Sequence, residues 1–354
     1  MFETKTKLEF DKIKVSIIIP CRNEEKHIKR CLDSIIANDF PRERLEVLVA
    51  DGISSDTTRD IVNDYAQKNQ FLKLLKNPKK TTSCALNIGI EHSMGDVIMK
   101  IDAHSIYKKD YISNCLKYLI EFDADNVGGI LIPISDDKSL ISEAIGLVIS
   151  SPFGVGGSYF RIGSTKPRWV DTVAFGCYRK QVFEKIGLYN EDLVRGQDME
   201  FNSRLRKSGG KILLHPKIIG YYYYPNTFFE FLRHNFTNGL WAILPFKHSD
   251  VLPVTLRHLV PLAFISITTF FGFAALFNAG YFLMFISIAA LYVLANLYFS
   301  VTTALRERNW RMIFLMPPVY AILHVSYGLG SLCGFAAIAA SNKFWRNLKH
   351  ILWK

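Results

Sequence analysis

An aspartate and a histidine stand two residues apart in Asp102-Ala103-His104, at the end of the apolar run DVIMKID. Residues two apart in an extended chain project to the same side, so the carboxylate and the imidazole can share one divalent cation. This donor pair suits Mn²⁺, Mg²⁺ or a similar ion. A metal there would bridge a pyrophosphate and stabilise charge on a leaving group. The alternative is a strand-end aspartate that caps the following turn beside an exposed histidine.

Other charged residues have both a chemical and a purely local interpretation. Asp51 follows the run LEVLVA and can accept hydrogen bonds from a ligand, although Asp-Gly is also a common turn. Asp198, in RGQDMEF, opens a predicted helix, where the dipole favours a carboxylate whether it is a base or a simple cap. Lys79, Lys80 and Arg22 can neutralise phosphates or can be solvated surface charge.

The elements that position these residues alternate between strand and helix. Short β-branched and apolar runs predict buried strands at 14–20, 45–50, 71–75 and 96–102. Helical spacing predicts helices at 24–37, 57–69 and 83–92. This alternation favours a doubly wound α/β sheet, whose ligands bind beyond the carboxyl ends of the strands. Pro20, Asp51 and Asp102 stand at those ends, so we expect three separate segments to meet in one crevice.

The middle of the chain is less regular. Strands are predicted at 126–133, 169–178, 211–215 and 218–224, and helices at 181–186 and 199–208. The glycines of PFGVGGSYFRIG favour a mobile substrate loop. Segment 228–246 mixes aromatic and basic side chains, as an interfacial helix does at a bilayer surface, but an ordinary amphipathic core helix fits equally well.

The last third of the chain is almost wholly apolar. Segments 258–277 and 280–301 reach the roughly 20 residues needed to cross a bilayer. Segment 312–340, interrupted by Pro317-Pro318, fits one kinked span or a shallow hairpin. A buried helical domain is the alternative for the whole region.

Basic residues predict how these spans are oriented. They flank the apolar segments in three groups: Lys247 and Arg257; Arg306, Arg308 and Arg311; Lys343, Arg346, Lys349 and Lys354. Basic flanks favour the cytosol. With all three groups cytosolic, the last apolar block must enter and leave on the same side.

Composition narrows the partners and the compartment. The net charge is +11, yet no block of Lys and Arg resembles a nucleic-acid-binding arm, so membrane lipids and phosphorylated ligands are favoured over nucleic acid. The six cysteines show no CxxC and no metal-ligand spacing, which indicates buried thiols in a reducing compartment. The charged N-terminus lacks an apolar core segment, so no cleavable signal peptide is expected and the catalytic part should stay cytosolic.

From about residue 14 to 241 the motifs together resemble family 2 glycosyltransferases of the GT-A fold. VSIIIPCRNEE resembles the first strand and its turn, and LVADGISSDTT resembles the second-strand aspartate and helix start. SCALNIGIEHSMGDVIMKIDAH resembles the helix that leads to the metal-binding DxD position, and VDTVAFGCYRKQ with RGQDMEF resembles the acceptor-side strand and catalytic helix. Within the family, the D-A-H variant and the C-terminal spans are most similar to succinoglycan-type membrane glycosyltransferases.

The resemblance implies roles for matching positions. Asp198 would be the general base that deprotonates an acceptor hydroxyl, and in-line attack would invert the anomeric centre. Asp102 would bind ribose or metal, and His104 would be a metal ligand. The implied donor-binding residues are Pro20, Asn23, Glu24, Asp51, Lys80, Asn87 and Asp102. The implied acceptor-side residues are Gly176, Gln197, His234 and Trp241.

Three departures from the family pattern matter. The DxD motif ends in His104, which permits metal binding but leaves the ion open between Mn²⁺ and Mg²⁺. The usual Glu-Asp pair is Gln197-Asp198, so the base is kept. The Gln-x-x-Arg-Trp motif of processive synthases is absent, and HNFTN stands at its place. We therefore predict transfer of a single sugar.

The expected organisation is a cytosolic catalytic domain at 1–227, an interfacial segment at 228–257, a transmembrane region at 258–341 and a basic tail at 342–354. The predicted protein is a multi-pass enzyme of the cell (inner) membrane that takes a nucleotide-sugar donor, with a UDP-sugar favoured, and a lipid-linked saccharide acceptor for polysaccharide or glycan synthesis. A processive polysaccharide synthase and a non-catalytic nucleotide-sugar-binding membrane protein are the alternatives. The sequence leaves the oligomeric state open.

Overall fold

The structure, a computed structural model, describes residues 9–247, 249 and 254–339, so the predicted basic tail at 342–354 lies outside the described residues. The chain divides into two compact units. The first comprises Met1–Ile132 and Gly163–Tyr223, and the second comprises Pro133–Ile162 and Tyr224–Lys354. The predicted catalytic domain at 1–227 therefore differs from the first unit, because residues 133–162 leave it and belong to the second.

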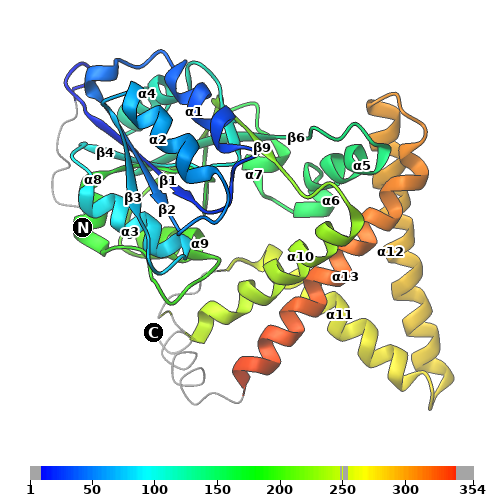
Figure 1. Cartoon of the computed structure of the whole chain (residues 1–354). Coiled ribbons are helices and arrows are strands. Elements are labelled where there is room, and N and C mark those ends of the chain that lie inside the picture. Colours follow the sequence, from blue (N-terminus) through cyan, green and yellow to red (C-terminus); the bar gives the residue numbers. More distant parts are fainter. Residues whose placement is uncertain (1–8, 248, 250–253, 340–354) are drawn as a thin grey trace. The chain divides into compact units, whose positions relative to one another are not determined.

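The first unit is built on one mixed sheet, which confirms the predicted α/β architecture (Figure 1). Its strands are β1 (Val15–Cys21), β2 (Leu45–Asp51), β3 (Leu72–Lys76), β4 (Val97–Lys100), β5 (Ser105–Tyr107), β6 (Asn126–Ile134), β7 (Arg168–Trp169), β8 (Cys177–Arg179) and β9 (Ile212–Tyr223). Among the described residues their order is β3-β2-β1-β4-β8-β6-β9-β5, and β7 also pairs with β9. Strands β3, β2, β1 and β4 are parallel, whereas β8 runs antiparallel to both β4 and β6.

The apolar runs of β1, β2 and β4 explain the centre of this sheet. Every residue of β2 and of β4 is buried, and in β1 only Pro20 is partly exposed. Strands that are covered on both faces need apolar residues at consecutive positions rather than at alternate ones. These three strands were predicted for that reason, and their parallel pairing brings their carboxyl ends to one edge of the sheet.

Helices α1 (Ile28–Ile36), α2 (Thr58–Lys68) and α3 (Thr82–His92) follow β1, β2 and β3 as predicted. Helix α1 begins four residues later than expected. The backbone N–H of Glu24 donates to Thr58 Oγ1 over 2.8 Å, and that of Glu25 donates to Asp56 Oδ2 over 3.3 Å. The expected first turn is therefore used to join the loops after β1 and β2.

The second half of the sheet differs from the predicted elements. The strand expected at 169–178 is interrupted between β7 and β8, where Phe175 has a φ of 54° in the left-handed region. The strands expected at 211–215 and 218–224 form the single strand β9, which runs through Pro216. Helix α4 (Tyr111–Glu121), strand β5 and helix α5 (Leu140–Ile149) were not predicted. Helices α8 (Lys180–Ile186) and α9 (Gln197–Lys207) agree with the expected ones to within two residues.

The second unit is helical. Its elements are α5, α6 (Pro152–Val155), α7 (Tyr159–Ile162), α10 (Phe228–Ile243), α11 (Leu256–Ala274), α12 (Ala279–Arg306) and α13 (Met312–Ala339). The glycine-rich segment expected to be a loop carries α6 and α7 instead. The ring of Phe153 on α6 lies 4.9–6.0 Å, between ring centroids, from the rings of Tyr292, Phe299, Tyr320 and His324. These contacts with α12 and α13 explain why residues 133–162 belong to this unit.

Helix α10 packs along α13 by close backbone approach. A Cβ at Gly239 would lie 2.0 Å from the carbonyl oxygen of Tyr327, and one at Gly330 would lie 2.0 Å from that of Phe236. Only glycine fits at such a crossing. The buried face of α10 therefore matches the core-helix alternative, while Phe229 and Leu232 stay exposed. An interfacial position for these two side chains remains a prediction.

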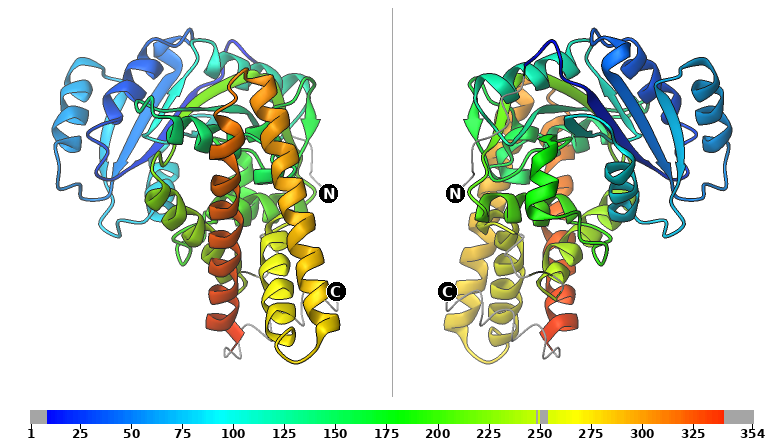
Figure 2. Two further views of the ribbon diagram at one scale, coloured as in Figure 1. Left: turned by 90° about the vertical axis from the view of Figure 1, so that its right-hand side faces the viewer. Right: turned by 90° about the vertical axis from the view of Figure 1, so that its left-hand side faces the viewer.

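Helices α11, α12 and α13 are each long and apolar enough to cross a membrane, and they pack side by side (Figure 2). Over residues 312–339 the last apolar block is one helix without a reversal, so of the two predicted alternatives it matches the single span and not the hairpin. A single helix that crosses a bilayer has its two ends on opposite sides. The expectation that this block enters and leaves on the same side therefore does not match its structure.

Candidate active site

The carboxyl ends of β1, β2 and β4 gather polar residues at one edge of the sheet. Cys21 at the end of β1 pairs with Asp51 at the end of β2, and Lys100 at the end of β4 pairs with Ile18. The loops that carry Asn23, Asp102 and His104 start there. The structure thus brings together the segments that the sequence predicted to converge.

Asp51 and Asn23 hold two of these loops together. The Asp51 carboxylate is buried, accepts from the backbone N–H of Ser54 over 3.2 Å and lies 3.6 Å from Arg59 Nε. Asn23 has a φ of 56°, and its Oδ1 accepts from the N–H of Ser55 over 2.9 Å. Pro20 lies just upstream at the end of β1, partly exposed. These contacts fix the conformation of the loops after β1 and β2, which form one side of the site.

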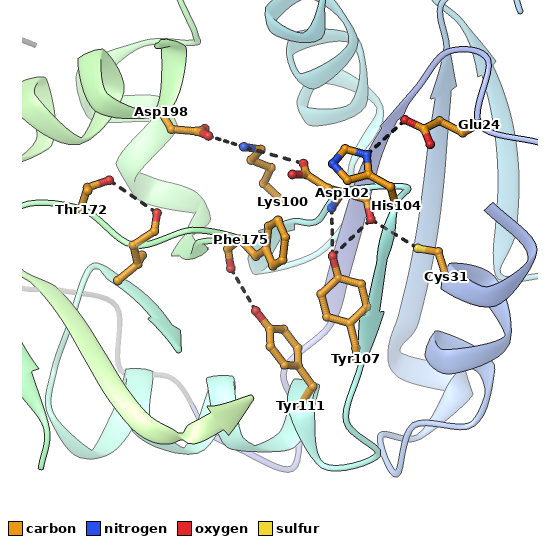
Figure 3. Close-up of polar contacts among 11 residues, drawn as sticks. Glu24, Cys31, Lys100, Asp102, His104, Tyr107, Tyr111, Thr172, Phe175 and Asp198 are labelled. Atoms are coloured by element: carbon orange, nitrogen blue, oxygen red, sulfur yellow. Dashed lines mark hydrogen bonds and ion pairs between the residues drawn. The ribbon is translucent and has the colours of Figure 1, made fainter. Parts of the chain in front are cut away.

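Asp102 and His104 lie on the segment between β4 and β5, as Figure 3 shows. The backbone of Asp102 is anchored, since its N–H donates to Tyr107 Oη over 2.9 Å and its carbonyl oxygen accepts from that hydroxyl over 3.3 Å. Its side chain keeps 30% of its surface exposed. His104 Nδ1 lies 3.1 Å from Glu24 Oε1. Partial burial opposes the charged imidazole, but the hydrogen bond to Glu24 and the charge of Asp102 outweigh it and raise the pKa of His104.

Lys100 joins the two sides of the site. Its ammonium bonds Asp198 Oδ2 and lies 4.0 Å from Asp102 Oδ1 (Figure 3). The Lys100 side chain is 7% exposed, whereas those of Asp102 and Asp198 are about one-third exposed. Burial disfavours the ammonium, but the two carboxylates outweigh this and raise the pKa of Lys100. The cation therefore links the donor-side aspartate to the predicted base.

Helix α9 presents Asp198 at its amino end. Gly196 precedes the helix with a φ of 77°, a left-handed conformation that favours glycine. Within the described residues, Asp198 Oδ1 and Gln197 Oε1 are buried and have no hydrogen-bond partner. One turn further along, the Asn202 amide donates to Thr172 Oγ1 over 2.8 Å and ties α9 to the segment before β8. An orphaned buried carboxylate oxygen is uncommon and indicates a place for a ligand.

Other predicted residues stand elsewhere. The Asn87 amide, buried in α3, donates to the carbonyl of Tyr189 over 2.9 Å and to Glu191 Oε1 over 3.1 Å. It holds the segment before α9 and does not point to the Asp102 cluster. Lys80 is exposed, with a φ of 63°.

Gly176 lies just before β8, where a Cβ would come 2.7 Å from Asn126 Oδ1, so this glycine makes room for close packing. His234 and Trp241 lie on α10, in the second unit. Of these three predicted acceptor-side residues, Gly176 belongs to the same unit as Asp198, and its carbonyl oxygen accepts from the backbone N–H of Lys100, the residue that bonds Asp198.

Lys100, Tyr107 and Asn202 were not among the site residues predicted from the sequence. A signal existed for Lys100, because a charged residue inside a run predicted to be buried on both faces requires a partner. No comparable signal marked Tyr107 or Asn202, whose partners come from distant segments.

The donor set at Asp102 and His104 fits a divalent cation. Glu24 can only accept a hydrogen bond as a carboxylate, so His104 Nδ1 carries the hydrogen in this contact and Nε2 is left as the metal-binding atom. Metal-binding histidines commonly have such a carboxylate partner. The described residues contain no group of three or more His, Cys, Asp or Glu placed to cage an ion. The remaining ligands would have to come from the donor and water.

Comparison with known proteins identifies the scaffold. The model of the family described as "Glycosyl transferase family 2" matches residues 16–187. The chain is 32% identical, over 233 residues, to a dolichyl N-acetyl-alpha-D-glucosaminyl phosphate 3-beta-D-2,3-diacetamido-2,3-dideoxy-beta-D-glucuronosyltransferase of Methanococcus voltae, covering 64% of this chain and 71% of that protein. The chain belongs to glycosyl transferase family 2.

Two other similarities extend this result. The family 2 chain is 28% identical, over 249 residues, to succinoglycan biosynthesis protein ExoA of Rhizobium meliloti, with 70% and 74% of the two chains covered. Its fold resembles that of a mannosyltransferase from Pyrobaculum calidifontis solved with GDP-Man and Mn²⁺, with a TM-score of 0.60, 18% identity and coverage of 90% and 87%. The predicted GT-A fold and the similarity to succinoglycan-type enzymes are confirmed, and the chain is a glycosyltransferase.

Proposed function

We propose that this glycosyltransferase moves one sugar, with inversion, from a nucleotide-diphosphate donor to a hydroxyl of a lipid-linked saccharide. The observation that carries the proposal is the Asp198 carboxylate, which has one oxygen held by Lys100 and the other buried without a partner among the described residues. A group arranged in this way is suited to accept a proton from an incoming hydroxyl. Asp102, on the other side of Lys100, would face the donor.

The proposed donor site uses the loops after β1, β2 and β4. Asp51, Pro20 and Asn23 would contact the nucleoside, and we favour a uridine. Lys80 is a candidate for the phosphates, whereas Asn87 would act indirectly through the segment before α9. Asp102 and His104 would hold a divalent cation, Mn²⁺ or Mg²⁺, which when bound stabilises charge on the departing diphosphate.

In the proposed reaction the acceptor oxygen forms a bond to the anomeric carbon while the bond from that carbon to the diphosphate oxygen breaks. The hydroxyl proton passes to Asp198 Oδ1, and the nucleoside diphosphate leaves with the bonding electrons. Attack on the face opposite the leaving group inverts the configuration. A positioned base typically contributes 10²–10⁴-fold to the rate. Gln197, whose Oε1 is also unpartnered among the described residues, is the nearest acceptor-side candidate in sequence.

Three features support a membrane-bound acceptor. The Methanococcus voltae relative is named for a dolichyl phosphate-linked sugar, and the Rhizobium meliloti relative for succinoglycan biosynthesis. Helices α11, α12 and α13 are able to cross a membrane. Basic residues flank these spans, and they would share the cytosolic side of the inner membrane with the catalytic unit. They are Lys247 and Arg257 around the start of α11, and Arg306, Arg308 and Arg311 at and after the end of α12.

The test uses membranes that contain the full chain, a panel of radiolabelled nucleotide sugars and a polyprenyl-diphosphate-linked saccharide. We expect one donor to add a single sugar, with loss of transfer on chelation and recovery with Mn²⁺ or Mg²⁺. Asp198→Asn should lower turnover by about 10²–10⁴-fold, whereas Asp60→Asn, on the exposed face of α2, should not. Near-wild-type turnover of Asp198→Asn would refute the base. Long products would indicate a processive synthase, and binding without transfer a non-catalytic protein.

A further inference from the structure

Lys100 is an unusual residue for the strand that carries it. The other residues of β4 are Val97, Ile98 and Met99, all buried, and Lys100 itself is only 6% exposed. Its backbone N–H donates to the carbonyl oxygen of Gly176 over 2.9 Å, which holds the residue between β4 and β8. A buried ammonium is costly unless carboxylates or other acceptors surround it. Its position therefore requires the two aspartates that it contacts.

The contact with Asp198 distinguishes the two oxygens of that carboxylate. Oδ2 accepts from Lys100, while Oδ1 is buried without a hydrogen-bond partner in the described part of the chain. Lys100 is also the one hydrogen-bond donor that the described residues offer to the Asp198 side chain. Without the ammonium, no hydrogen bond from the described residues would orient the Asp198 carboxylate.

The contact with Asp102 extends the same arrangement to the donor side. Lys100 Nζ lies 4.0 Å from Asp102 Oδ1, too far for a good hydrogen bond but close enough for attraction between opposite charges. One cation on a rigid central strand thus sets the place of both aspartates. Asp102 and Asp198 lie on segments that are far apart in the sequence.

We propose that Lys100 is a positioning residue that holds Asp198 by Oδ2, so that Oδ1 is the oxygen presented to the acceptor hydroxyl. Lys100 would also fix the position of this base relative to Asp102. This inference rests on the proposed function, because it assigns Lys100 a task only if Asp198 is the base. Lys100 does not touch the reacting atoms. It acts through the orientation of Asp198, and a small misplacement of a reacting group can lower a rate by about 10²-fold.

The experiment compares Lys100→Met, Lys100→Arg, Asp198→Asn and the double variant Lys100→Met/Asp198→Asn in the full-length membrane enzyme. Lys73→Met is the matched control, because Lys73 also pairs with a carboxylate from a neighbouring strand, Glu46, but is half exposed on β3. The measurements are kcat and KM for donor and acceptor, together with the affinity for UDP as a probe of the donor site.

We expect Lys100→Met to lower kcat by about 10–100-fold while UDP affinity changes by less than about threefold, since positioning affects the reacting geometry rather than binding. Lys100→Arg should recover part of the loss because it restores the cation. In the Asp198→Asn background the Lys100→Met change should cost less than about threefold, because residues that act as a unit are not additive. Lys73→Met should behave as wild type.

Two results would overturn the proposal. An equal loss from Lys100→Met with and without Asp198 would show that Lys100 does not act through the base. A large loss of UDP affinity with unchanged kcat would show that it serves only the donor side. If Lys100→Met does not fold, as judged by thermal unfolding, the same comparison is made with Lys100→Arg. Wild-type turnover of Asp198→Asn, in contrast, would refute the base itself and so separate a failure of the proposed function from a failure of the Lys100 assignment.

Discussion

The two units of this chain place polar and apolar side chains in opposite ways. In the first unit, Val47, Leu48 and Val49 on β2 are fully buried, and buried charged residues such as Lys100 and Glu200 are held in ion pairs. In the second, Leu291 and Leu294 on α12 are 71% and 65% exposed, while the same helix buries Asn296, Ser300 and Thr303. An apolar core that is shielded from water explains the first pattern. The second is expected of helices whose outer surface meets lipid and whose polar groups bond to neighbouring helices.

The buried polar residues of the two units differ in the kind of partner that they have. Polar residues at the edge of the sheet include charged groups held in ion pairs, such as Lys100 with Asp198. The buried polar residues described in the second unit include no Asp or Glu, and they bond neutral partners, as Tyr320 Oη does with Ser151 Oγ over 2.6 Å. This difference supports the proposal that the first unit carries the chemistry and that the second anchors the chain in a membrane.

The largest effect should come from a charge on the outer face of α12. Leu294→Lys should raise the apparent free energy of membrane insertion by about 3–4 kcal/mol, because a favourable leucine is lost and a lysine near the centre of a span loses its hydration. Met94→Lys, at a comparably exposed site of the first unit, should change stability by less than about 0.5 kcal/mol. A glycosylation-reporter insertion assay measures the first and thermal unfolding the second. Equal, small effects would show that α12 does not meet lipid.

A methyl group at the α10–α13 crossing should be the next most damaging change. Gly330→Ala would place a Cβ 2.0 Å from the carbonyl oxygen of Phe236, so the two helices must separate at a cost of about 1–3 kcal/mol. Gly272→Ala is the control, because its nearest heavy atom, on Phe285, lies 3.4 Å away, and it should gain up to about 1 kcal/mol of helix propensity. Thermal unfolding in detergent compares the two. Destabilisation of both variants alike would contradict the close crossing.

The loss of a buried polar side chain should cost more in the sheet unit than in the helical one when that side chain has more hydrogen-bond partners. Asn202→Leu leaves the Tyr178 hydroxyl, the Asn126 amide and the Thr172 hydroxyl without this partner and should cost about 1–3 kcal/mol. Ser331→Ala removes one bond, to the carbonyl oxygen of Gly239, and should cost about 0.6 kcal/mol, the average for such bonds between membrane helices. Denaturation of each variant measures the loss in its free energy of unfolding. A larger loss for Ser331→Ala than for Asn202→Leu would contradict this difference between the units.

The smallest expected effect is the acid sensitivity of the first unit. Burial raises the pKa of Glu46, but the N–H of Met94, the hydroxyl of Ser16 and Lys73 outweigh it, so the pKa is lowered in the folded protein. A lowered carboxyl pKa stabilises the fold above the ordinary glutamate pKa of about 4.3, and this stabilisation is lost as the pH falls through the folded value. Glu46→Gln should therefore unfold with less pH dependence between pH 7 and pH 3. If Glu46→Gln lost stability between pH 7 and pH 3 as the wild type does, the contacts of Glu46 would not be the cause of that loss.

Much of this protein followed from the sequence alone, because the decisive patterns were local. Uninterrupted apolar runs predicted β1, β2 and β4, and Asp51 at the end of β2 and Asp102 after β4 had to lie at the same edge of the sheet once those strands were parallel. The length of the apolar segments predicted α11 and α12 in the same way. The hydrophobic pattern of a segment indicates how completely its side chains are buried. This is sufficient to predict a helix or strand when all of its faces have the same kind of surroundings.

Only the tertiary structure decided which side chains pack against or bond to one another. Residues 133–162 join the helical unit because Phe153 packs among rings on α12 and α13, and nothing in the segment itself names those partners. Asn87 turned out to hold the segment before α9 rather than to face the Asp102 cluster. Lys100 became the link between Asp102 and Asp198 because two segments distant in the chain, the end of β4 with its following loop and the start of α9, meet at one edge of the sheet. A pattern in sequence records that such a charge needs a partner, but only the folded chain supplies it.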